Sequence, residues 1–225
     1  MDLFHLLNRG VDKRQIFLDN QDRARFVHDM YEFNDKPSAA NTRRRISPAF
    51  AEGSTFDLRS RTSERVRIVD IHGWCIMGNH YHLLLSEIEE GGITTFIRKL
   101  NIRYAKYFNE RYERDGALFQ GRTKRICINS DAYFLHILHY IHLNPLDLLE
   151  SCKGWRERRI IGAARALAHL EKYRWSSYLD YCGHKNFPSI LTTDLFGGVF
   201  KDYKREVREY LNDLDIASIR PLILE

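Results

Sequence analysis

The sequence predicts an α+β fold in which helices cover one face of an antiparallel sheet and a mostly helical C-terminal extension follows. Two observations indicate this class. Apolar runs suited to strands take turns with segments whose apolar residues recur every three or four positions, as they do in amphipathic helices. Of the 225 residues, 44% are hydrophobic and 29% are charged, which is a globular composition that can supply a packed core. A wholly disordered chain is therefore excluded.

The first part of the chain predicts a strand, a helix and an insertion. An apolar run at residues 4–8 suits a short strand. Asp19 or Asn20 is suited to cap a helix that reaches about Phe33. Residues 34–64 contain two prolines and many Ser and Thr without any periodicity. We interpret them as an irregular insertion.

The middle of the chain predicts a hairpin, a helix and another strand. Residues 66–77 and 81–86 have the apolar composition of two strands, and Gly78-Asn79 between them suits a tight turn. Apolar residues within 93–108 recur at i, i+3, i+4 and i+7, which predicts an amphipathic helix. Residues 117–128 predict the next strand.

A second amphipathic helix opens at Asp131 and ends at Pro145, because proline cannot continue a helix. The resulting order of strand, helix, strand, strand, helix, strand and helix predicts a ferredoxin-like or RRM-like antiparallel sheet. We assign it to a first domain, residues 1–149. Residues 150–225 are expected to form the helical extension, with helices at 157–172 and 203–214.

Charge and cysteine usage narrow the class of protein. Lys and Arg number 35 against 30 Asp and Glu, a formal net charge of +5. No apolar run approaches the ~18 residues that suggest a membrane span, and the N-terminus lacks the pattern of a secretory signal. The four cysteines, which form no CxxC pair, favour reduced thiols. We therefore expect a basic, cytoplasmic protein without membrane contact.

The sharpest local motif is His80-Tyr81-His82, placed where the second hairpin strand begins. Residues i and i+2 of a strand point to the same face, so both imidazoles should lie side by side while Tyr81 points away. Two neutral imidazoles are half of a divalent-metal site and need further ligands. The spacing alone, however, favours the simpler interpretation of two histidines on a half-exposed strand.

A second motif lies at the end of the helix that Asp131 opens. Tyr140 and Asn144 are one turn apart, so a phenol and an amide oxygen project together. If this helix packs beside the histidine strand, Asn144 can complete a metal site and Tyr140 can attack a phosphodiester that the metal polarises. Tyr133, two turns earlier, is a second candidate nucleophile. The alternative is that Tyr140 is a rim aromatic and Asn144 merely ends the helix.

Basic and aromatic residues are interleaved between Arg98 and Arg125, with nine Lys or Arg against three acidic residues. A groove for single-stranded nucleic acid needs charge for the backbone and rings for base stacking. The alternative is a solvated helix face whose rings belong to the core, and it suits Tyr104 and Phe108. The candidate nucleic-acid-binding residues are Arg9, Arg98, Arg103, Lys106, Arg122, Lys124 and Arg125.

Taken together, these motifs resemble a known family. The segment from Met77 to Leu85 is similar to the HUH signature of the REP-associated tyrosine transposases, relatives of the single-strand transposases of bacterial insertion sequences. The resemblance spans residues 4 to about 180. It continues, in order, through Asn8-Arg9-Gly10, Ile16-Phe17, Leu118-Phe119-Gln120-Gly121-Arg122, Tyr140-Ile141-His142-Leu143-Asn144-Pro145 and Trp175-Ser176-Ser177-Tyr178. Several ordered motifs are more specific than one, and they reverse the preference for the simpler interpretation of the histidine pair.

The resemblance implies a metal-dependent single-stranded DNA transposase, a nickase and ligase that acts on DNA with hairpin structure. His80, His82 and Asn144 would bind Mg²⁺ or Mn²⁺, and Tyr140 would form a 5′-phosphotyrosine intermediate before the strands are rejoined. No small-molecule cofactor is implied, and a monomer is favoured over a homodimer. The extension would be a DNA-binding accessory.

The chain also departs from the family pattern. Gly78 stands where proline is common, and the segment after Asn144 lacks the usual Arg-Ala-Gly. These changes are expected to affect DNA recognition more than catalysis. Two other functions stay open at this point: a non-catalytic single-stranded nucleic-acid-binding module, and a phosphodiesterase that uses water in place of tyrosine.

Overall fold

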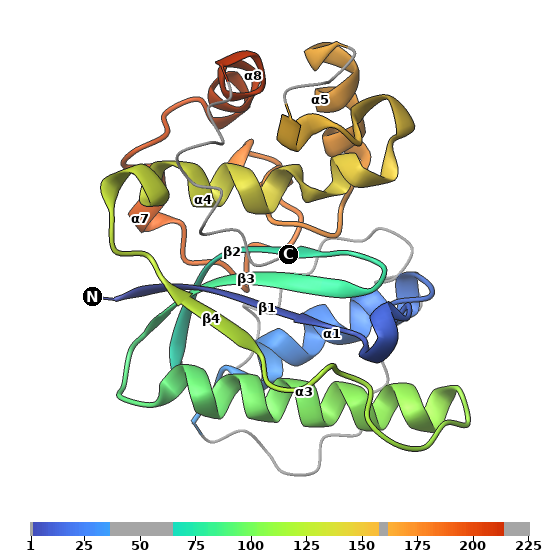
Figure 1. Cartoon of the computed structure of the whole chain (residues 1–225). Coiled ribbons are helices and arrows are strands. Elements are labelled where there is room, and N and C mark those ends of the chain that lie inside the picture. Colours follow the sequence, from blue (N-terminus) through green and yellow to red (C-terminus); the bar gives the residue numbers. More distant parts are fainter. Residues whose placement is uncertain (1, 37–64, 158–161, 214–225) are drawn as a thin grey trace.

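A four-stranded antiparallel sheet forms the centre of the protein, as the computed structural model in Figure 1 shows. The structure describes residues 2–36, 65–157 and 162–213. The strands run in the order β2-β3-β1-β4, in which β1 lies between β3 and β4. They are β1 (Leu3–Arg9), β2 (Val69–Ile76), β3 (His80–Glu87) and β4 (Lys124–Cys127). This order and the connecting helices give the ferredoxin-like topology that the sequence predicts.

The helices of the described residues fall into two groups. The first group belongs to the sheet domain: α1 (Asn20–Phe33), α3 (Gly92–Arg111) and α4 (Asp131–Leu143). The second follows it: α5 (Ala163–Lys172), α6 (Tyr178–Tyr181), α7 (Asp194–Gly197) and α8 (Tyr203–Asp213). Short 3₁₀ turns are η1 (Val11–Lys13), η2 (Asn144–Leu148), η3 (Glu150–Cys152) and η4 (Trp155–Glu157). The predicted helical character of the C-terminal region is confirmed, while its boundary as a separate domain stays a prediction.

Side-chain caps fix where two of these helices begin. The carboxylate of Asp19 accepts a hydrogen bond from the backbone N–H of Asp22 at 3.0 Å, and α1 starts one residue later. The hydroxyl of Ser130 accepts one from the backbone N–H of Tyr133 at 3.3 Å at the start of α4. Each cap satisfies an N–H that has no partner within the helix. The caps therefore fix the first residues of α1 and α4.

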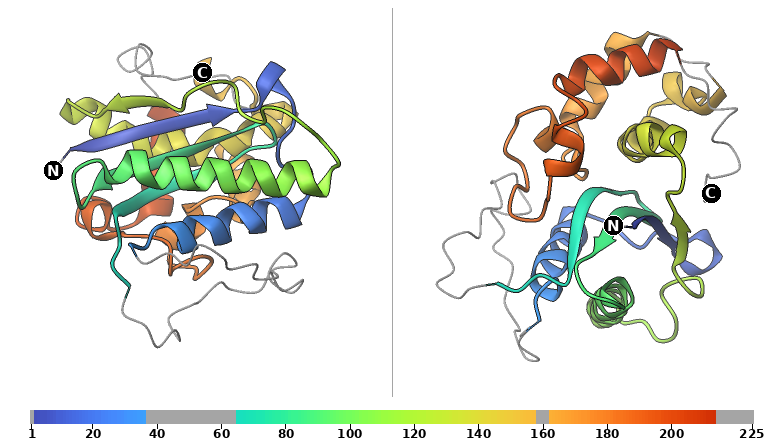
Figure 2. Two further views of the ribbon diagram at one scale, coloured as in Figure 1. Left: turned by 90° about the horizontal axis from the view of Figure 1, so that it is seen from below. Right: turned by 90° about the vertical axis from the view of Figure 1, so that its left-hand side faces the viewer.

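Helices lie on both faces of the sheet. Figure 2 shows α1 and α3 side by side on one face, as predicted, whereas α4 crosses the opposite face beneath the C-terminal helices. The sheet thus contributes to two separate cores. The first surrounds Phe26, whose ring lies 4.8 Å from that of Tyr81 and 5.1 Å from that of Tyr104. The second joins Leu84 of the sheet to Ile137 of α4 and the helices beyond it.

The last strand is shorter than predicted. The sequence suggests a strand over residues 117–128, but β4 covers only Lys124–Cys127. Gly116 and Gly121 have positive φ angles of 85° and 69°, which an extended strand does not contain. The segment between them touches the sheet through an isolated bridge from Phe119 to Gly10.

Two further predictions concern segments that lie partly outside the described residues. Most of the insertion predicted at 34–64 lies outside them, since residues 37–64 are not described. The helix predicted at 157–172 begins at Ala163, after residues 158–161, which are likewise outside the description. Throughout the described ranges, no helix combines the length and the apolar character needed to cross a bilayer.

Candidate active site

The alternation of side chains along β1 and β3 directs three histidines toward α4. His80 and His82 share a face of β3, with ring centroids 5.0 Å apart and ring planes nearly perpendicular at 84°. Tyr81 points the other way, where its hydroxyl donates to the side-chain oxygen of Asn101 at 2.8 Å. This confirms the predicted placement of the two imidazoles side by side. The third histidine, His5 of β1, had no predicted role.

His82 is fully buried and makes its contact through one ring nitrogen. Its Nδ1 lies 2.9 Å from Nε2 of His5, and the two rings are stacked with centroids 5.2 Å apart. Burial, together with the positive charges of Arg156 and Arg9, lowers the pKa of His82 to about 3. His82 is therefore neutral at ordinary pH, and a neutral imidazole is the form that binds a metal ion.

Tyr140 meets the histidines from the opposite side, on α4. Its ring is edge-on to that of His82 at 5.8 Å and to that of His5 at 5.9 Å. The side chain is buried, with 2% of the residue exposed. The sequence motif required that this helix pack beside the histidine strand, and the structure has that packing. A phenol and two imidazoles thus share one site, although they come from three different elements.

Asn144 follows α4 directly and is fully buried. Its side-chain nitrogen donates to the backbone oxygen of Tyr140 at 2.9 Å, which holds the amide one turn from the phenol, as predicted. Its side-chain oxygen accepts a hydrogen bond from Nη2 of Arg156 at 2.7 Å. The amide oxygen that the sequence suggests as a metal ligand is therefore also the acceptor for a guanidinium.

Arg156, in η4, was not predicted to belong to the site. Its Nη1 lies 2.6 and 2.7 Å from the two carboxylate oxygens of Asp147, and its guanidinium lies over the ring of Trp155 at 4.3 Å. The same group is 5.7 Å from the ring centroid of Tyr140. Asp147 also accepts a hydrogen bond from the indole of Trp155 at 2.8 Å. These contacts fix a positive charge beside Tyr140 and Asn144.

Tyr133, the second candidate nucleophile, lies in the same cluster, next to His5. Its hydroxyl is 3.2 Å from Nδ1 of His5. Burial raises the pKa of Tyr133 above the ordinary value of a phenol. Tyr133 is thus harder to deprotonate than an exposed tyrosine, which makes it a poor nucleophile.

The donor atoms available suit a divalent cation that accepts nitrogen and oxygen ligands. No group of three or more His, Cys, Asp or Glu residues that could hold a metal occurs in residues 2–36, 65–157 and 162–213. The candidate set is therefore two imidazoles and one amide oxygen, with water or a phosphate oxygen available to complete the shell. The neutral state of His82 fits this role. Asn144 fits it only if its oxygen serves Arg156 and the ion together, or if Arg156 moves.

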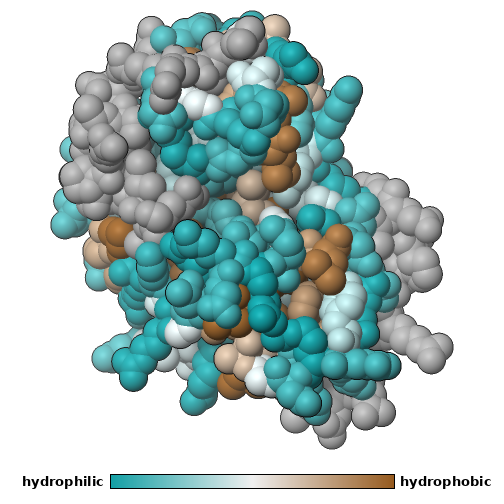
Figure 3. Space-filling model, turned by 45° about the vertical axis from the view of Figure 1, so that its right-hand side comes forward, coloured by the Kyte–Doolittle hydropathy of each residue, from teal (hydrophilic) through white to brown (hydrophobic). Residues whose placement is uncertain are grey.

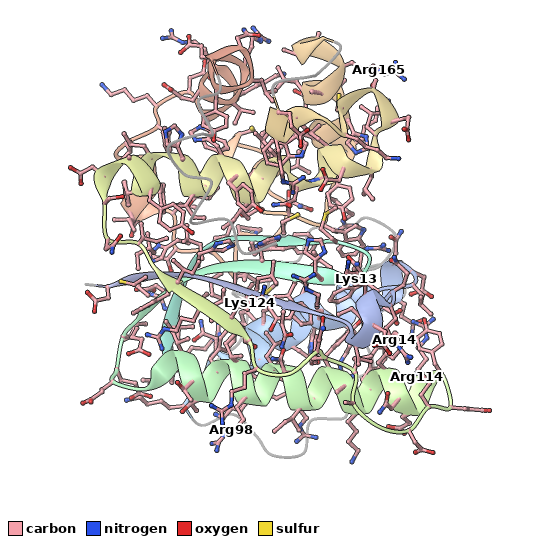
Figure 4. All side chains as sticks on the ribbon, viewed as in Figure 1. Lys13, Arg14, Arg98, Arg114, Lys124 and Arg165 are labelled. Atoms are coloured by element: carbon pink, nitrogen blue, oxygen red, sulfur yellow. The ribbon has the colours of Figure 1, made fainter. Side chains whose placement is uncertain are left out.

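The basic residues predicted to bind nucleic acid fall into two groups. The first group lies near the histidines: Arg9 pairs with His80 across β1 and β3, and Lys124 of the edge strand β4, which follows Arg122 in the chain, pairs with Leu7 beside His82. Arg125 lies over the ring of Phe4 at 3.6 Å and pairs with Leu6 of the first core, so it is on the opposite face of the sheet from the histidines. Figure 4 shows Lys124 on β4.

The second group comprises Arg98, Arg103 and Lys106 on α3, the helix on the opposite face of the sheet from Tyr140. Figure 4 shows Arg98 at the outer side of α3, directed away from the sheet. Arg103 lies 5.9 Å from the ring centroid of Phe33. A single short DNA segment bound at the histidines would reach the first group more readily than the second.

The aromatic residues of this region belong mostly to the core. Tyr104 and Phe108 are buried, as the alternative interpretation of the basic region suggests. The hydroxyls of Tyr107 and Tyr112 donate to the carboxylate of Asp22 at 3.0 and 2.9 Å. Tyr104 and Phe108 therefore belong to the first core, as the sequence predicts, and cannot serve as a stacking platform for bases.

Two cations near the site escaped the sequence analysis. Lys13 and Arg14 are exposed in and after η1, and Figure 4 shows them close together at one end of the sheet. The turn is held against the hairpin turn that precedes His80, since Gly10 donates to the backbone oxygen of Asn79 at 2.8 Å. Figure 3 shows a largely hydrophilic face with scattered hydrophobic side chains. Their position near the site follows only from the packing of two turns that are far apart in the chain.

The sheet thus presents the buried His82, with the half-buried His80 beside it, to a tyrosine on α4. Residues 56–144 match the family model described as "Transposase IS200 like", and both histidines, Tyr140 and Asn144 lie within the match. Over residues 56–144 the chain is therefore similar to the IS200-like transposases, a family of metal-dependent HUH tyrosine transposases.

Among solved structures, one described as a REP-associated tyrosine transposase bound to a REP hairpin is similar to this chain. The similarity covers 86% of each chain at 14% sequence identity, with a TM-score of 0.46. No curated protein matches the chain by sequence.

Proposed function

We propose that the protein cleaves single-stranded DNA beside a hairpin through a covalent bond to Tyr140 and then rejoins DNA strands. The observation that carries this proposal is the edge-on contact of the Tyr140 ring with His82 at 5.8 Å, inside a buried site. A binding module needs neither a buried imidazole pair nor a phenol beside it. The two together are the parts that a nucleophile and a metal-assisted phosphoryl transfer require.

The metal ligands in this proposal are His80, His82 and Asn144. Because Nδ1 of His82 faces His5, Nε2 is the atom that would bind the ion. A bound Mg²⁺ or Mn²⁺ would supply charge to polarise the scissile phosphate. Arg156 holds the side-chain oxygen of Asn144 and so sets the direction of that amide.

Tyr140 supplies the nucleophile. Its phenolic oxygen forms a bond to phosphorus as the bond from phosphorus to the 3′ oxygen breaks, and the phenolic proton is lost while the 3′ oxygen gains one. The guanidinium of Arg156, 5.7 Å from the Tyr140 ring centroid, favours the negative charge that develops on the phenol. The product is a 5′-phosphotyrosine, from which a second 3′-hydroxyl can displace Tyr140. Since the free energy of the cleaved phosphodiester bond is kept in the phosphotyrosine bond, rejoining needs no nucleoside triphosphate.

The DNA backbone would lie along the basic group nearest to the histidines. Arg9, Arg122 and Lys124 are at least partly exposed there, and Lys13 and Arg14 extend the same charge. Phosphate contacts fix the position of a strand without reading its sequence, so they suit a substrate recognised by its hairpin shape. A monomeric state, a cytoplasmic location and a DNA-binding role for residues 150–225 stay predictions.

The test is a denaturing gel after incubation with an end-labelled single strand that contains a hairpin. With Mn²⁺, label is expected to migrate with the protein, and EDTA is expected to prevent this. The variant Tyr140→Phe should bind DNA but form no adduct, whereas Tyr210→Phe, which alters a tyrosine of α8, should form it normally.

The other outcomes separate the two alternative functions. Tight binding without cleavage, with or without metal, would identify a nucleic-acid-binding module. Cut DNA with free ends and no label on the protein would identify a phosphodiesterase that uses water. An adduct that persists in Tyr140→Phe would show that another residue is the nucleophile.

A further inference from the structure

His5 is a buried histidine that the proposed reaction does not yet use. It lies on β1, between β3 and β4, where it pairs with Leu84 on one side and Ile126 on the other. Its residue is 0% exposed. Each of its ring nitrogens faces a polar partner: Nε2 is 2.9 Å from Nδ1 of His82, and Nδ1 is 3.2 Å from the hydroxyl of Tyr133. Because β1 is paired with a strand on each side and both ring nitrogens face a polar partner, the position of the His5 ring is well defined.

Counting protons along this chain of hydrogen bonds gives one arrangement that suits metal binding. A neutral imidazole carries one proton, and a nitrogen that binds a metal must offer its lone pair. If Nε2 of His82 binds the ion, the proton of His82 is on Nδ1 and is donated to Nε2 of His5. His5 then carries its own proton on Nδ1 and donates it to the hydroxyl oxygen of Tyr133. Every contact in the chain receives one proton.

We propose that His5 is a positioning residue, which holds His82 in the tautomer and orientation whose Nε2 faces the metal, and that Tyr133 holds His5 in turn. This inference rests on the proposed function, because it assumes that His82 is a metal ligand. Histidine ligands commonly donate their second N–H to a fixed acceptor, and loss of that acceptor typically costs 10–100-fold in metal affinity or activity. Here the acceptor is another imidazole, and Tyr133 has a role other than that of nucleophile.

The competing explanation is that His5 only fills space in the second core. Two substitutions separate the explanations. His5→Phe keeps a ring that stacks on His82 and packs against Tyr140, but it removes both hydrogen bonds. His5→Gln loses the ring, yet its amide oxygen can take the place of Nε2 as the acceptor for His82. Packing predicts that phenylalanine is the better substitute, whereas positioning predicts glutamine.

The first measurement is the affinity of the full-length protein for Mn²⁺ in the absence of DNA, determined by electron paramagnetic resonance. His5→Phe is expected to weaken binding about 10–100-fold, and His5→Gln less than about 3-fold. Tyr133→Phe, which removes only the distant hydroxyl, should weaken it by a smaller factor than His5→Phe. Circular dichroism establishes that each variant is folded, and the Tyr133 variant keeps the proposal testable if His5→Phe is not.

The second measurement needs no metal. Nitrogen-15 NMR of His82 in the metal-free protein should show the proton on Nδ1 in the wild type, and a mixture of tautomers in His5→Phe. Equal Mn²⁺ affinities for wild type and His5→Phe, with the His82 tautomer unchanged, would overturn the inference and leave the proposed function standing. Absence of Mn²⁺ binding in the wild type, unaltered by His82→Ala, would instead overturn the metal role of His82, while the NMR result would still decide whether His5 fixes the tautomer.

Discussion

The two faces of the sheet use the same strands for different purposes. On the α1 and α3 face, Tyr81 packs among aromatic rings and its hydroxyl is satisfied by Asn101. On the α4 face, the adjacent His82 contacts His5 and Tyr140. Two adjacent residues of β3 therefore face a structural core on one side of the sheet and the candidate active site on the other. The difference shows that alternation lets a short motif support a stable core while it presents reactive groups on the other side.

The strongest test of this comparison removes one tyrosine hydroxyl from each face of the sheet. Tyr140→Phe is expected to lower covalent adduct formation by at least about 1,000-fold, because the nucleophile is removed. Tyr81→Phe should keep the adduct but lower the free energy of unfolding by about 1 kcal/mol, through loss of the bond to Asn101. Labelled-DNA gels and urea unfolding measure the two effects. Loss of the adduct in Tyr81→Phe at full folding would remove the distinction between the faces.

Each face also has an arginine held by acidic side chains. Arg111 lies 2.6 Å from the buried carboxylate of Asp22, whereas Arg156 binds Asp147 and the amide of Asn144. Arg111→Leu should cost about 2–3 kcal/mol of unfolding free energy because the buried carboxylate of Asp22 loses a positively charged partner, with adduct formation per folded molecule retained. Arg156→Leu should lower adduct formation about 10–100-fold, because Asn144 loses the group that orients it. Equal activities of the two variants would show that Arg156 is structural.

Acid should destabilise the α4 face. Burial lowers the pKa of His139 to about 4, below the ordinary 6.5, so the unfolded chain binds more protons between these values. Stability is therefore fully present above about pH 6.5 and falls as the pH drops toward 4, by at most about 3 kcal/mol from this residue. Urea unfolding at several pH values measures the change. His139→Phe should flatten the curve, and an unaltered curve would mean that other groups cause the loss.

The smallest expected effect distinguishes the two basic groups. Binding to a hairpin-containing single strand should weaken with salt, with a slope of about 0.7 for each phosphate contact to single-stranded DNA. Lys124→Ala should reduce that slope by about 0.7, while Arg98→Ala on α3 should reduce it less. Fluorescence anisotropy at several salt concentrations gives both slopes. Equal reductions would indicate that DNA reaches around to the α3 face.

Local spacing predicted much of this site. A period of two placed His80 and His82 together, and one helical turn placed Tyr140 beside Asn144. These relations depend on backbone geometry over a few residues, which the sequence determines. The aromatic residues of α3 show where such reasoning stops, because periodicity finds the apolar stripe but does not say which rings face a ligand.

Contacts between distant segments could not be predicted. The contact between His5 and His82 joins residues 77 positions apart and depends on the register between β1 and β3. Arg156 reaches Asn144 from an irregular segment that has no periodicity. The prediction that the helices cover one face of the sheet is likewise wrong for α4, because a helix after the last strand can fold back onto either face.

The most direct test of the central claim is to locate the DNA on the protein. The adduct formed with Mn²⁺ would be digested with nuclease and trypsin, and the peptide 126–153, which contains both Tyr133 and Tyr140, would be sequenced by tandem mass spectrometry. The proposed mechanism predicts a phosphonucleotide on Tyr140. A nucleotide on Tyr133, or cleaved DNA with an unmodified peptide, would contradict it.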